Sequence, residues 1–219
     1  MKVFVGYDRR EDLAYKVCKH SLEKFGNEVR PIVQDEMREL GWYDRPVDTQ
    51  AATEFSLTRF LTPYWAIKTH SDQFVAFVDC DFLFTVNVED VLQEIDKSKA
   101  ISVVKHNYIP KSSMKMDGQV QHTYPRKNWS SFIVFNLCHP AVRNLTPSVV
   151  NTSTPAYLHR FEWVADDDIG ELDKTWNFLV GEYEPEGTPK AIHYTLGGPW
   201  FGIDCDYGDL WTQESQFVK

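Results

Sequence analysis

The segment Phe74-Val75-Ala76-Phe77-Val78-Asp79-Cys80-Asp81 predicts a buried strand with an acidic end. Its first five residues are apolar on both alternating faces, as in a central strand of a parallel sheet. Two carboxylates one residue apart follow directly, at the point where the chain leaves the core. Carboxylate oxygens suit Mg²⁺ and Mn²⁺ as ligands. The segment therefore indicates a cation site at the mouth of a buried strand.

Strands and helices alternate on both sides of this segment. Residues 2–7 predict a first strand, the apolar face within 14–25 predicts a helix, and 29–33 predict a second strand. Asp8 stands at the N-cap position of that helix, with Glu11 three residues later. A β-α-β opening of this kind is the unit of a parallel sheet.

The later part of the chain continues the alternation. The expected elements are a loop at 35–53, helices at 54–61, 88–95 and 166–172, a helix restart at Thr62-Pro63, strands at 100–104, 132–135 and 191–194, and a polar loop at 106–127 that could act as a mobile lid or acceptor loop. The pattern predicts the α/β class, as one domain over 1–219 with a mostly parallel central sheet flanked by helices.

The composition argues against several classes of protein. The formal net charge of -9 disfavours a nucleic-acid partner, because nucleic acids attract basic surfaces. No run approaches the roughly 20 apolar residues of a membrane helix, and the N-terminus lacks the apolar stretch of a signal peptide. The 4 cysteines are scattered without a C-x-x-C pair, which is typical of reduced thiols. We therefore expect a cytoplasmic protein without a transmembrane segment.

Three polar features are expected at the carboxyl ends of the strands, where ligands bind in open α/β sheets. They are Tyr7-Asp8, the triplet Asp79-Cys80-Asp81, and His193 in the last strand. Two carboxylates and an imidazole suit Mn²⁺ or Mg²⁺, but solvated turn acids, an N-cap and a packed histidine would give the same pattern. A second triplet, Asp204-Cys205-Asp206, does not follow a buried strand and is not expected to bind metal.

Four motifs resemble those of GT-A-fold glycosyltransferases, and specifically glycosyltransferase family 8, the glycogenin and bacterial galactosyltransferase group. Asp79-Cys80-Asp81 resembles the family's D-x-D, and the run from His193 to Trp200 resembles its H-x-x-G-x-x-K-P-W element. The run from Leu172 to Asn177 is similar to its L-P-x-x-W-N segment, and 166–169 to its D-Q-D motif. The motifs occur in the family's order across nearly the whole chain. In size, the small single-domain glycosyltransferases of bacteria and large DNA viruses are the nearer match.

The resemblance implies roles for individual residues. Asp79, Asp81 and His193 would be the metal ligands, while Asp166 and Asp167 would line the donor-sugar pocket as catalytic residues. The positions implied for the donor nucleotide-sugar are Tyr7, Asp8, Ser56, Arg59, Asp79, Cys80, Gly197, Gly198 and Trp200. Residues 1–105 would form mainly the nucleotide-binding half, and 106–219 mainly the acceptor and sugar half.

The chain departs from the family pattern at the element that follows His193. This element is one residue shorter, and Gly198 replaces the family's lysine. The diphosphate charge would then be neutralised by the metal, by backbone N–H groups near Gly198, or by Arg126, Lys127 or Lys190. The segment 129–136 follows its family counterpart only loosely, which leaves the sugar open. Among the aromatic residues, Trp42, Tyr43 and Trp200 are expected to face a ligand.

Taken together, the resemblance implies a metal-dependent glycosyltransferase that uses Mn²⁺ or Mg²⁺ and a nucleotide-sugar, most simply a UDP-sugar. The acceptor would be a glycan or a small hydroxyl compound. The motifs favour retention of anomeric configuration, with donor oxygens taking the acceptor's proton; inversion would need a general base such as Asp167 or Asp168. A sugar-phosphate nucleotidyltransferase and a non-catalytic nucleotide-sugar-binding module are the alternatives.

Overall fold

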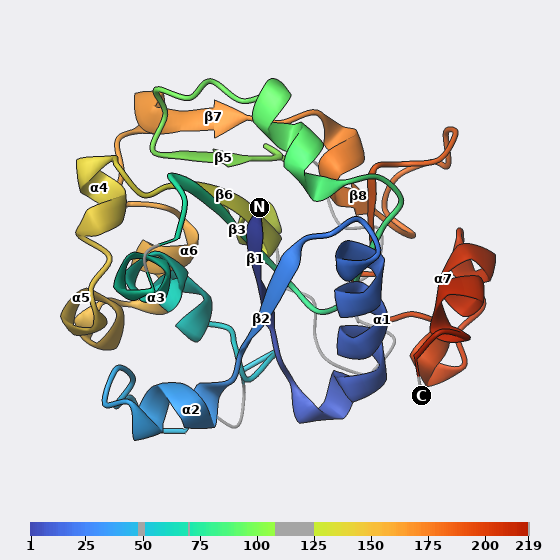
Figure 1. The fold of residues 1–219 in the computed structure, drawn as a ribbon, viewed down its shortest axis with the longest axis horizontal. Coiled ribbons are helices and arrows are strands. Elements are labelled where there is room, and N and C mark those ends of the chain that lie inside the picture. Colours follow the sequence, from blue (N-terminus) through green and yellow to red (C-terminus); the bar gives the residue numbers. More distant parts are fainter. Residues whose placement is uncertain (48–50, 70, 108–124, 219) are drawn as a thin grey trace.

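The computed structural model describes residues 1–47, 51–69, 71–107 and 125–218 (Figure 1). The strands are β1 Lys2–Gly6, β2 Glu28–Ile32, β3 Phe74–Val78, β4 Phe82–Phe84, β5 Ile101–Val103, β6 Phe132–Asn136, β7 Ile169–Glu171, β8 Phe178–Leu179 and β9 Ala191–His193. The α-helices are α1 Asp12–Glu23, α2 Gln34–Glu39, α3 Thr62–Lys68, α4 Pro140–Arg143, α5 Pro147–Thr152, α6 Pro155–His159 and α7 Gly208–Ser215.

A six-stranded sheet with the order β2-β1-β3-β6-β5-β7 forms the centre of the molecule. β3 pairs in parallel with β1 and antiparallel with β6, and β6 is the one described strand of this sheet that runs against the others. The side chains of β3 from Val75 to Val78 are fully buried, because both faces of the sheet are covered. The predicted α/β class with a mostly parallel sheet is confirmed.

A second, small sheet with the order β4-β9-β8 was not expected from the sequence. Its strand β4 follows β3 after only three residues, Asp79-Cys80-Asp81, so this triplet joins the two sheets. The backbone N–H of Asp79 donates to the backbone O of Ser131, the residue before β6 of the large sheet (2.9 Å). The backbone O of Asp81 accepts from the backbone N–H of Tyr194, the residue after β9 of the small sheet (3.0 Å). Backbone bonds to both sheets therefore fix the triplet.

Helices cover the large sheet on its two sides. In Figure 1, α1 and α7 lie on one side and α3 to α6 lie on the other. The predicted apolar face of α1 is buried, with Val17, Cys18 and Leu22 fully enclosed, and α1 contacts both β4 and α7. The small sheet, α1 and α7 enclose a separate apolar cluster, whose buried members are Val17, Leu83, Phe178, Val180, Ile192, Tyr194 and Trp211.

The predicted helix at 166–172 is wrong. Asp166–Asp168 forms a 3₁₀ turn, and Ile169–Glu171 is β7 at the edge of the large sheet, paired in parallel with β5. Gly170 allows this pairing, because a Cβ there would lie 2.8 Å from Ser102 Oγ. An edge strand of three residues is too short to show an alternating pattern, and the acidic turn before it resembles the start of a helix.

Two other expectations need correction. Most of helix α2 falls within the predicted loop at 35–53, and its Met37 is fully buried. The helix is too short to be recognised from its sequence pattern, because it is stabilised by the packing of this one side chain. The predicted helices at 54–61 and 88–95 are 3₁₀ helices over Thr58–Leu61 and Val88–Gln93. The predicted restart is confirmed, since α3 begins at Thr62 with Pro63 in its first turn.

Most of the predicted lid at 106–127 lies outside the described residues. All four cysteines are free, as predicted. Among the helices that the structure describes, none combines the length and the apolar character needed to cross a membrane.

Candidate active site

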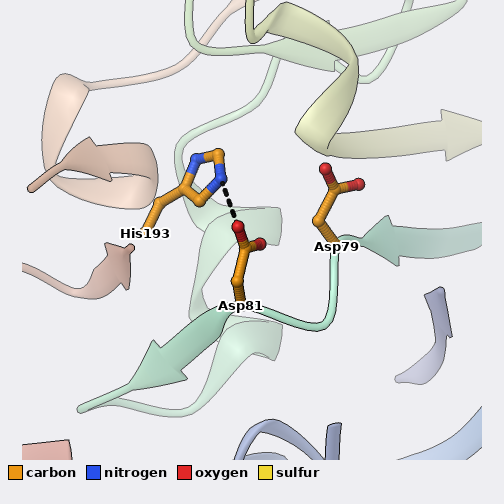
Figure 2. Close-up of side chains that lie close together, drawn as sticks. All are labelled: Asp79, Asp81 and His193. Carbon is orange, nitrogen blue, oxygen red and sulfur yellow. Dashed lines mark ion pairs between the residues drawn. The ribbon is translucent and has the colours of Figure 1, made fainter. Parts of the chain in front are cut away.

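The joint between the two sheets brings Asp79, Asp81 and His193 together. One ligand atom from each of the three side chains lies within 4.8 Å of the others. Figure 2 shows Asp79 just after β3, Asp81 just before β4, and His193 reaching across from β9. His193 Nε2 lies 3.3 Å from Asp81 Oδ2, because Phe82 and His193 are direct partners in the small sheet. The donor set of two carboxylates and one imidazole fits Mn²⁺ or Mg²⁺.

Hydrogen bonds fix which nitrogen of His193 faces the cluster. Asn177 Nδ2 donates to the backbone O of Asn128 at 3.2 Å and to Ser131 Oγ at 2.8 Å, which orients the Asn177 carbonyl oxygen toward His193. That oxygen lies 2.9 Å from His193 Nδ1 and accepts its proton. His193 also stacks on Phe82, with ring centroids 4.3 Å apart. Nε2 is therefore the nitrogen that faces the carboxylates, the arrangement of a histidine that can ligate a metal ion.

Arg59 holds the first carboxylate of the cluster. Its Nη1 donates to Asp79 Oδ1 at 2.7 Å and to Ser130 O at 2.8 Å. The guanidinium lies against the rings of Phe55 and Phe77, 5.2 and 5.1 Å from their centroids, and only 5% of Arg59 is exposed. Contacts on this many sides leave Arg59 and the Asp79 oxygen little freedom to move.

A polar cavity surrounds the cluster. Its described lining residues are Glu11, Ala52, Thr53, Phe55, Ser56, Arg59, Asp79, Asp81, Asn128, Ser130, Ser131, His159, His193, Thr195, Leu196, Gly197 and Phe201. Three carboxylates and one guanidinium are among them, so acidic groups outnumber basic ones in the described lining. A divalent cation suits a lining with this balance of charged groups.

The predicted donor residues Ser56, Arg59 and Gly197 line this cavity, together with Asp79. Cys80 does not: it is fully buried, its Sγ lies 3.3 Å from Glu11 Oε2, and burial with the nearby Glu11 carboxylate raises the pKa of its thiol well above the usual range. The Cys80 side chain therefore belongs to the core behind the cavity.

Tyr7 and Asp8 are engaged within the protein. The Asp8 carboxylate accepts hydrogen bonds from Arg10 Nε (3.0 Å) and Nη2 (2.7 Å), and from the backbone N–H groups of Arg10 and Glu54. Burial alone would raise the pKa of Asp8, but these hydrogen bonds lower it below its ordinary value. Tyr7 OH donates to Asp12 Oδ1 at 3.1 Å. Neither residue lines the cavity, so a direct contact with a base is not apparent in this geometry.

Asp166 and Asp167 are not brought to the cavity. They precede the amino end of β7, which runs in the same direction as β3, whereas Asp79 follows the carboxyl end of β3. Asp166 is exposed and pairs with Arg126 at 2.6 Å, and Asp167 offers its backbone oxygen to Lys99 Nζ at 2.8 Å. The role of both aspartates beside the donor sugar is implied by the motif resemblance alone, and the described lining of the cavity does not include them.

The basic residues considered for the diphosphate lie elsewhere. Lys190 Nζ pairs with Glu94 at 2.5 Å and lies over the ring of Trp176, while Arg126 is engaged with Asp166. Lys127 is also not part of the described lining. Of the Lys and Arg side chains in the described part of the chain, Arg59 alone lines the cavity.

None of the three aromatic residues expected to face a ligand is in the described lining of this cavity, although Tyr43 borders a separate hollow with Arg9 and Gln34. Trp42 meets Trp65 edge-on at 6.1 Å, and only 6% of Tyr43 is exposed. Trp200 packs on Trp211 at 5.6 Å, and a Cβ on Gly198 would lie 2.3 Å from the Trp200 ring. Gly198 therefore accommodates Trp200 rather than a ligand.

Several cavity residues are not among the site residues predicted from the sequence. They are Glu11, Thr53, Asn128, Ser130, Ser131, His159 and Thr195. Of these, Ser130, Ser131 and Thr195 lie in segments compared with family motifs. His159 Nδ1 lies 2.9 Å from Ser130 Oγ, and burial together with the nearby Arg59 guanidinium lowers the pKa of His159 to about 3. Asn177 does belong to a recognised motif, but only the fold connects it with His193.

Comparison with known proteins identifies the fold. No protein-family model matches the chain. The chain is 47% identical to Protein CDI of Arabidopsis thaliana over 98% of its own length and 86% of that protein. The solved structure of the bifunctional glycosyltransferase WbbM matches 99% of the chain with a TM-score of 0.68 and 14% identity, and the chain spans only 50% of that structure. The structure of the galactosyltransferase LgtC, solved with donor and acceptor sugar analogs, matches 99% of this chain, and the match covers 95% of the LgtC chain. The TM-score is 0.59 and the sequence identity is 10%. The predicted GT-A fold is confirmed.

Proposed function

The chain belongs to the family of Protein CDI from Arabidopsis thaliana, and we propose that it acts as a glycosyltransferase. In this proposal it moves a sugar from a nucleotide-sugar, a UDP-sugar in the simplest case, to a hydroxyl group of an acceptor. The observation that carries the proposal is the cluster of Asp79, Asp81 and His193 at the joint of the two sheets in a GT-A fold. The motif resemblance to glycosyltransferase family 8 supports the same conclusion.

Asp79, Asp81 and His193 are the residues that would hold a divalent cation. A bound Mn²⁺ or Mg²⁺ supplies electrostatic stabilisation of the charge that develops on a leaving diphosphate. Arg59 holds Asp79 in place by a hydrogen bond, while Asn177 orients the ring of His193 toward the site. The ligand atoms are therefore held in place by the protein itself, which lowers the free-energy cost of ordering them when an ion binds.

The remaining cavity residues suit an uncharged polar ligand. Asn128, Ser130 and Thr195 carry amide and hydroxyl groups of the kinds that donate to or accept from sugar hydroxyls. Ser56 and Gly197 lie on the same cavity and remain the proposed donor contacts. The lining draws on both halves of the chain, and the proposal keeps donor binding mainly in 1–105 and sugar or acceptor binding mainly in 106–219.

The carboxylates of the described lining favour retention of anomeric configuration. Asp79 and Asp81 would be occupied by the cation, and Glu11 contacts Cys80. Because Asp166, Asp167 and Asp168 lie outside the described lining, that lining offers no further carboxylate as the general base that inversion would need. A donor oxygen that takes the acceptor's proton then remains the simplest base.

Calorimetric titration of UDP tests the proposal. We expect UDP to bind in the presence of Mn²⁺ and to lose most of its affinity in EDTA or after Asp81→Ala. Asp206→Ala is the matched control, because it changes the same position of the second Asp-Cys-Asp triplet. It should leave UDP binding unchanged.

Product analysis then identifies the reaction. UDP release from a panel of UDP-sugars in the presence of hydroxyl acceptors would support a transferase. Formation of a UDP-sugar from UTP and a sugar phosphate would identify a nucleotidyltransferase instead, and binding without turnover would indicate a non-catalytic module. UDP affinity that survives both EDTA and Asp81→Ala would contradict the role of the cation.

A further inference from the structure

Phe201 combines exposure with a place in the cavity. It is a large apolar side chain that is 45% exposed, and it lines the same cavity as Asp79 and His193. The other exposed large apolar side chains of the described part of the chain do not line this cavity. Ligand cavities pair apolar surfaces with a few polar groups, so an aromatic ring at this place is available to a ligand.

The turn Pro199–Phe201 holds this ring in position. Trp200 is its anchor, since its ring packs on Tyr194 at 6.0 Å and on Trp211 at 5.6 Å in the small apolar cluster. Phe201 N donates to Gly198 O at 3.0 Å. One aromatic residue of the turn is therefore fixed inside the protein, and the next one is presented to the cavity.

Exposure places Phe201 on the solvent side of the cation cluster. Only 2% of His193 is exposed, against 45% of Phe201. Leu196 and Gly197 border both this cavity and a neighbouring hollow that also includes Asp204 and Asp206. A ligand can thus extend from the mouth of the cavity toward Asp204 and Asp206. A donor with its diphosphate at the cation cluster would leave this outer side to the acceptor.

We propose that Phe201 forms the aromatic wall of the acceptor site and that the acceptor is a sugar, whose apolar C–H face stacks on the ring. The inference rests on the proposed transferase function and narrows its acceptor class from any hydroxyl compound to a glycan. Sugar rings suit such a wall, because their C–H faces are apolar and slightly positive while an aromatic face is negative. The hydroxyl groups at the ring edge would meet the polar lining.

Binding of methyl glycosides tests the proposal. Methyl glucosides, galactosides, mannosides and xylosides of both anomers are added to the protein with Mg²⁺ and UDP, and saturation-transfer NMR measures their binding. A methyl aglycone is needed because an aromatic one would itself stack on Phe201. We expect at least one glycoside to bind through its ring C–H protons, and Phe201→Ala to weaken it by about tenfold.

Two variants and one separate measurement keep the outcomes distinct. Phe201→Trp should preserve glycoside binding, and Phe217→Ala is the control, since Phe217 is 71% exposed and stacks on His20 instead. Calorimetric affinity for UDP should stay within about twofold in Phe201→Ala, because the ring does not contact the cation cluster. Glycoside binding that Phe201→Ala leaves intact, or a wild-type protein that binds none of the glycosides, would overturn the inference. Loss of UDP binding in the wild type would instead reject the proposed function.

Discussion

At the scale of single residues, the candidate site depends on groups that hold the ligand atoms rather than on the ligand atoms alone. Asn177 is fully buried, and its amide is oriented by two acceptors on one side and His193 on the other. Arg59 in turn holds the carboxylate of Asp79 by a hydrogen bond from Nη1. Fixed partners of this kind tune a metal site because they set both the direction and the basicity of its ligands.

Asn177→Ala should weaken Mn²⁺ binding. Without the Asn177 oxygen, His193 can rotate or take the other tautomer, and the loss of such a partner typically costs about 10- to 100-fold in metal affinity. Titration followed by electron paramagnetic resonance measures free Mn²⁺ directly. The exposed Asn144 provides the control variant Asn144→Ala. Equal Mn²⁺ affinity in Asn177→Ala and the wild type would contradict the assigned tautomer.

His159 should make the protein less stable in mild acid. Burial and Arg59 lower the pKa of His159 to about 3 in the folded state, against about 6.5 when unfolded. Between these values the unfolded chain binds the extra proton, so stability falls as pH decreases from about 6.5, by up to about 1.4 kcal/mol per pH unit. Urea denaturation of the wild type and of His159→Asn between pH 7 and 5 tests this. The variant should lose less stability over the interval, and parallel curves would contradict the low pKa.

At the scale of elements, length decides how much of the structure can be predicted. The five apolar residues of β3 and the twelve-residue helix α1 carry patterns long enough to be recognised. The three-residue strand β7 and the six-residue helix α2 do not, because tertiary pairing and a single buried Met37 stabilise them instead.

The candidate site divides in the same way. Asp79 and Asp81 could be predicted, because they directly follow a recognisable strand. His159 and the pairing of Arg59 with Asp79 could not, since residues far apart in sequence come together only when the sheet forms. The same holds for the polar side chain of Asn177, which meets His193 across the boundary between β8 and β9.

The turn that presents Phe201 depends on a glycine. In Gly198→Ala the new methyl group would lie 2.3 Å from the Trp200 ring, so the ring must shift within the small apolar cluster. Overpacking of this kind costs about 1–3 kcal/mol, which urea denaturation would measure. Gly208→Ala is the matched control, because its Cβ meets only ordinary contacts at 3.5 and 3.6 Å. Similar stability of both variants would show that the turn can adjust without cost.

At the scale of the whole molecule, the two sheets meet at the residues proposed to bind the cation. Asp79 belongs to the end of the large sheet, and Asp81 and His193 belong to the small one. A cation held by all three would therefore link the two sheets, and it could bind only when both are formed. Ligand binding and folding of the complete domain should then be coupled.

Mn²⁺ and UDP together should raise the melting temperature of the protein. At a concentration about 100 times the dissociation constant, a ligand that binds only the folded state adds about 2.7 kcal/mol, which corresponds to about 5–10 °C for a domain of this size. Scanning calorimetry should show one transition that moves as a whole, because the linked sheets unfold together. EDTA or Asp81→Ala should abolish the shift, while Asp206→Ala should preserve it. If only part of the transition moved with ligand, the two sheets would be unfolding independently, and the cation could not be joining them.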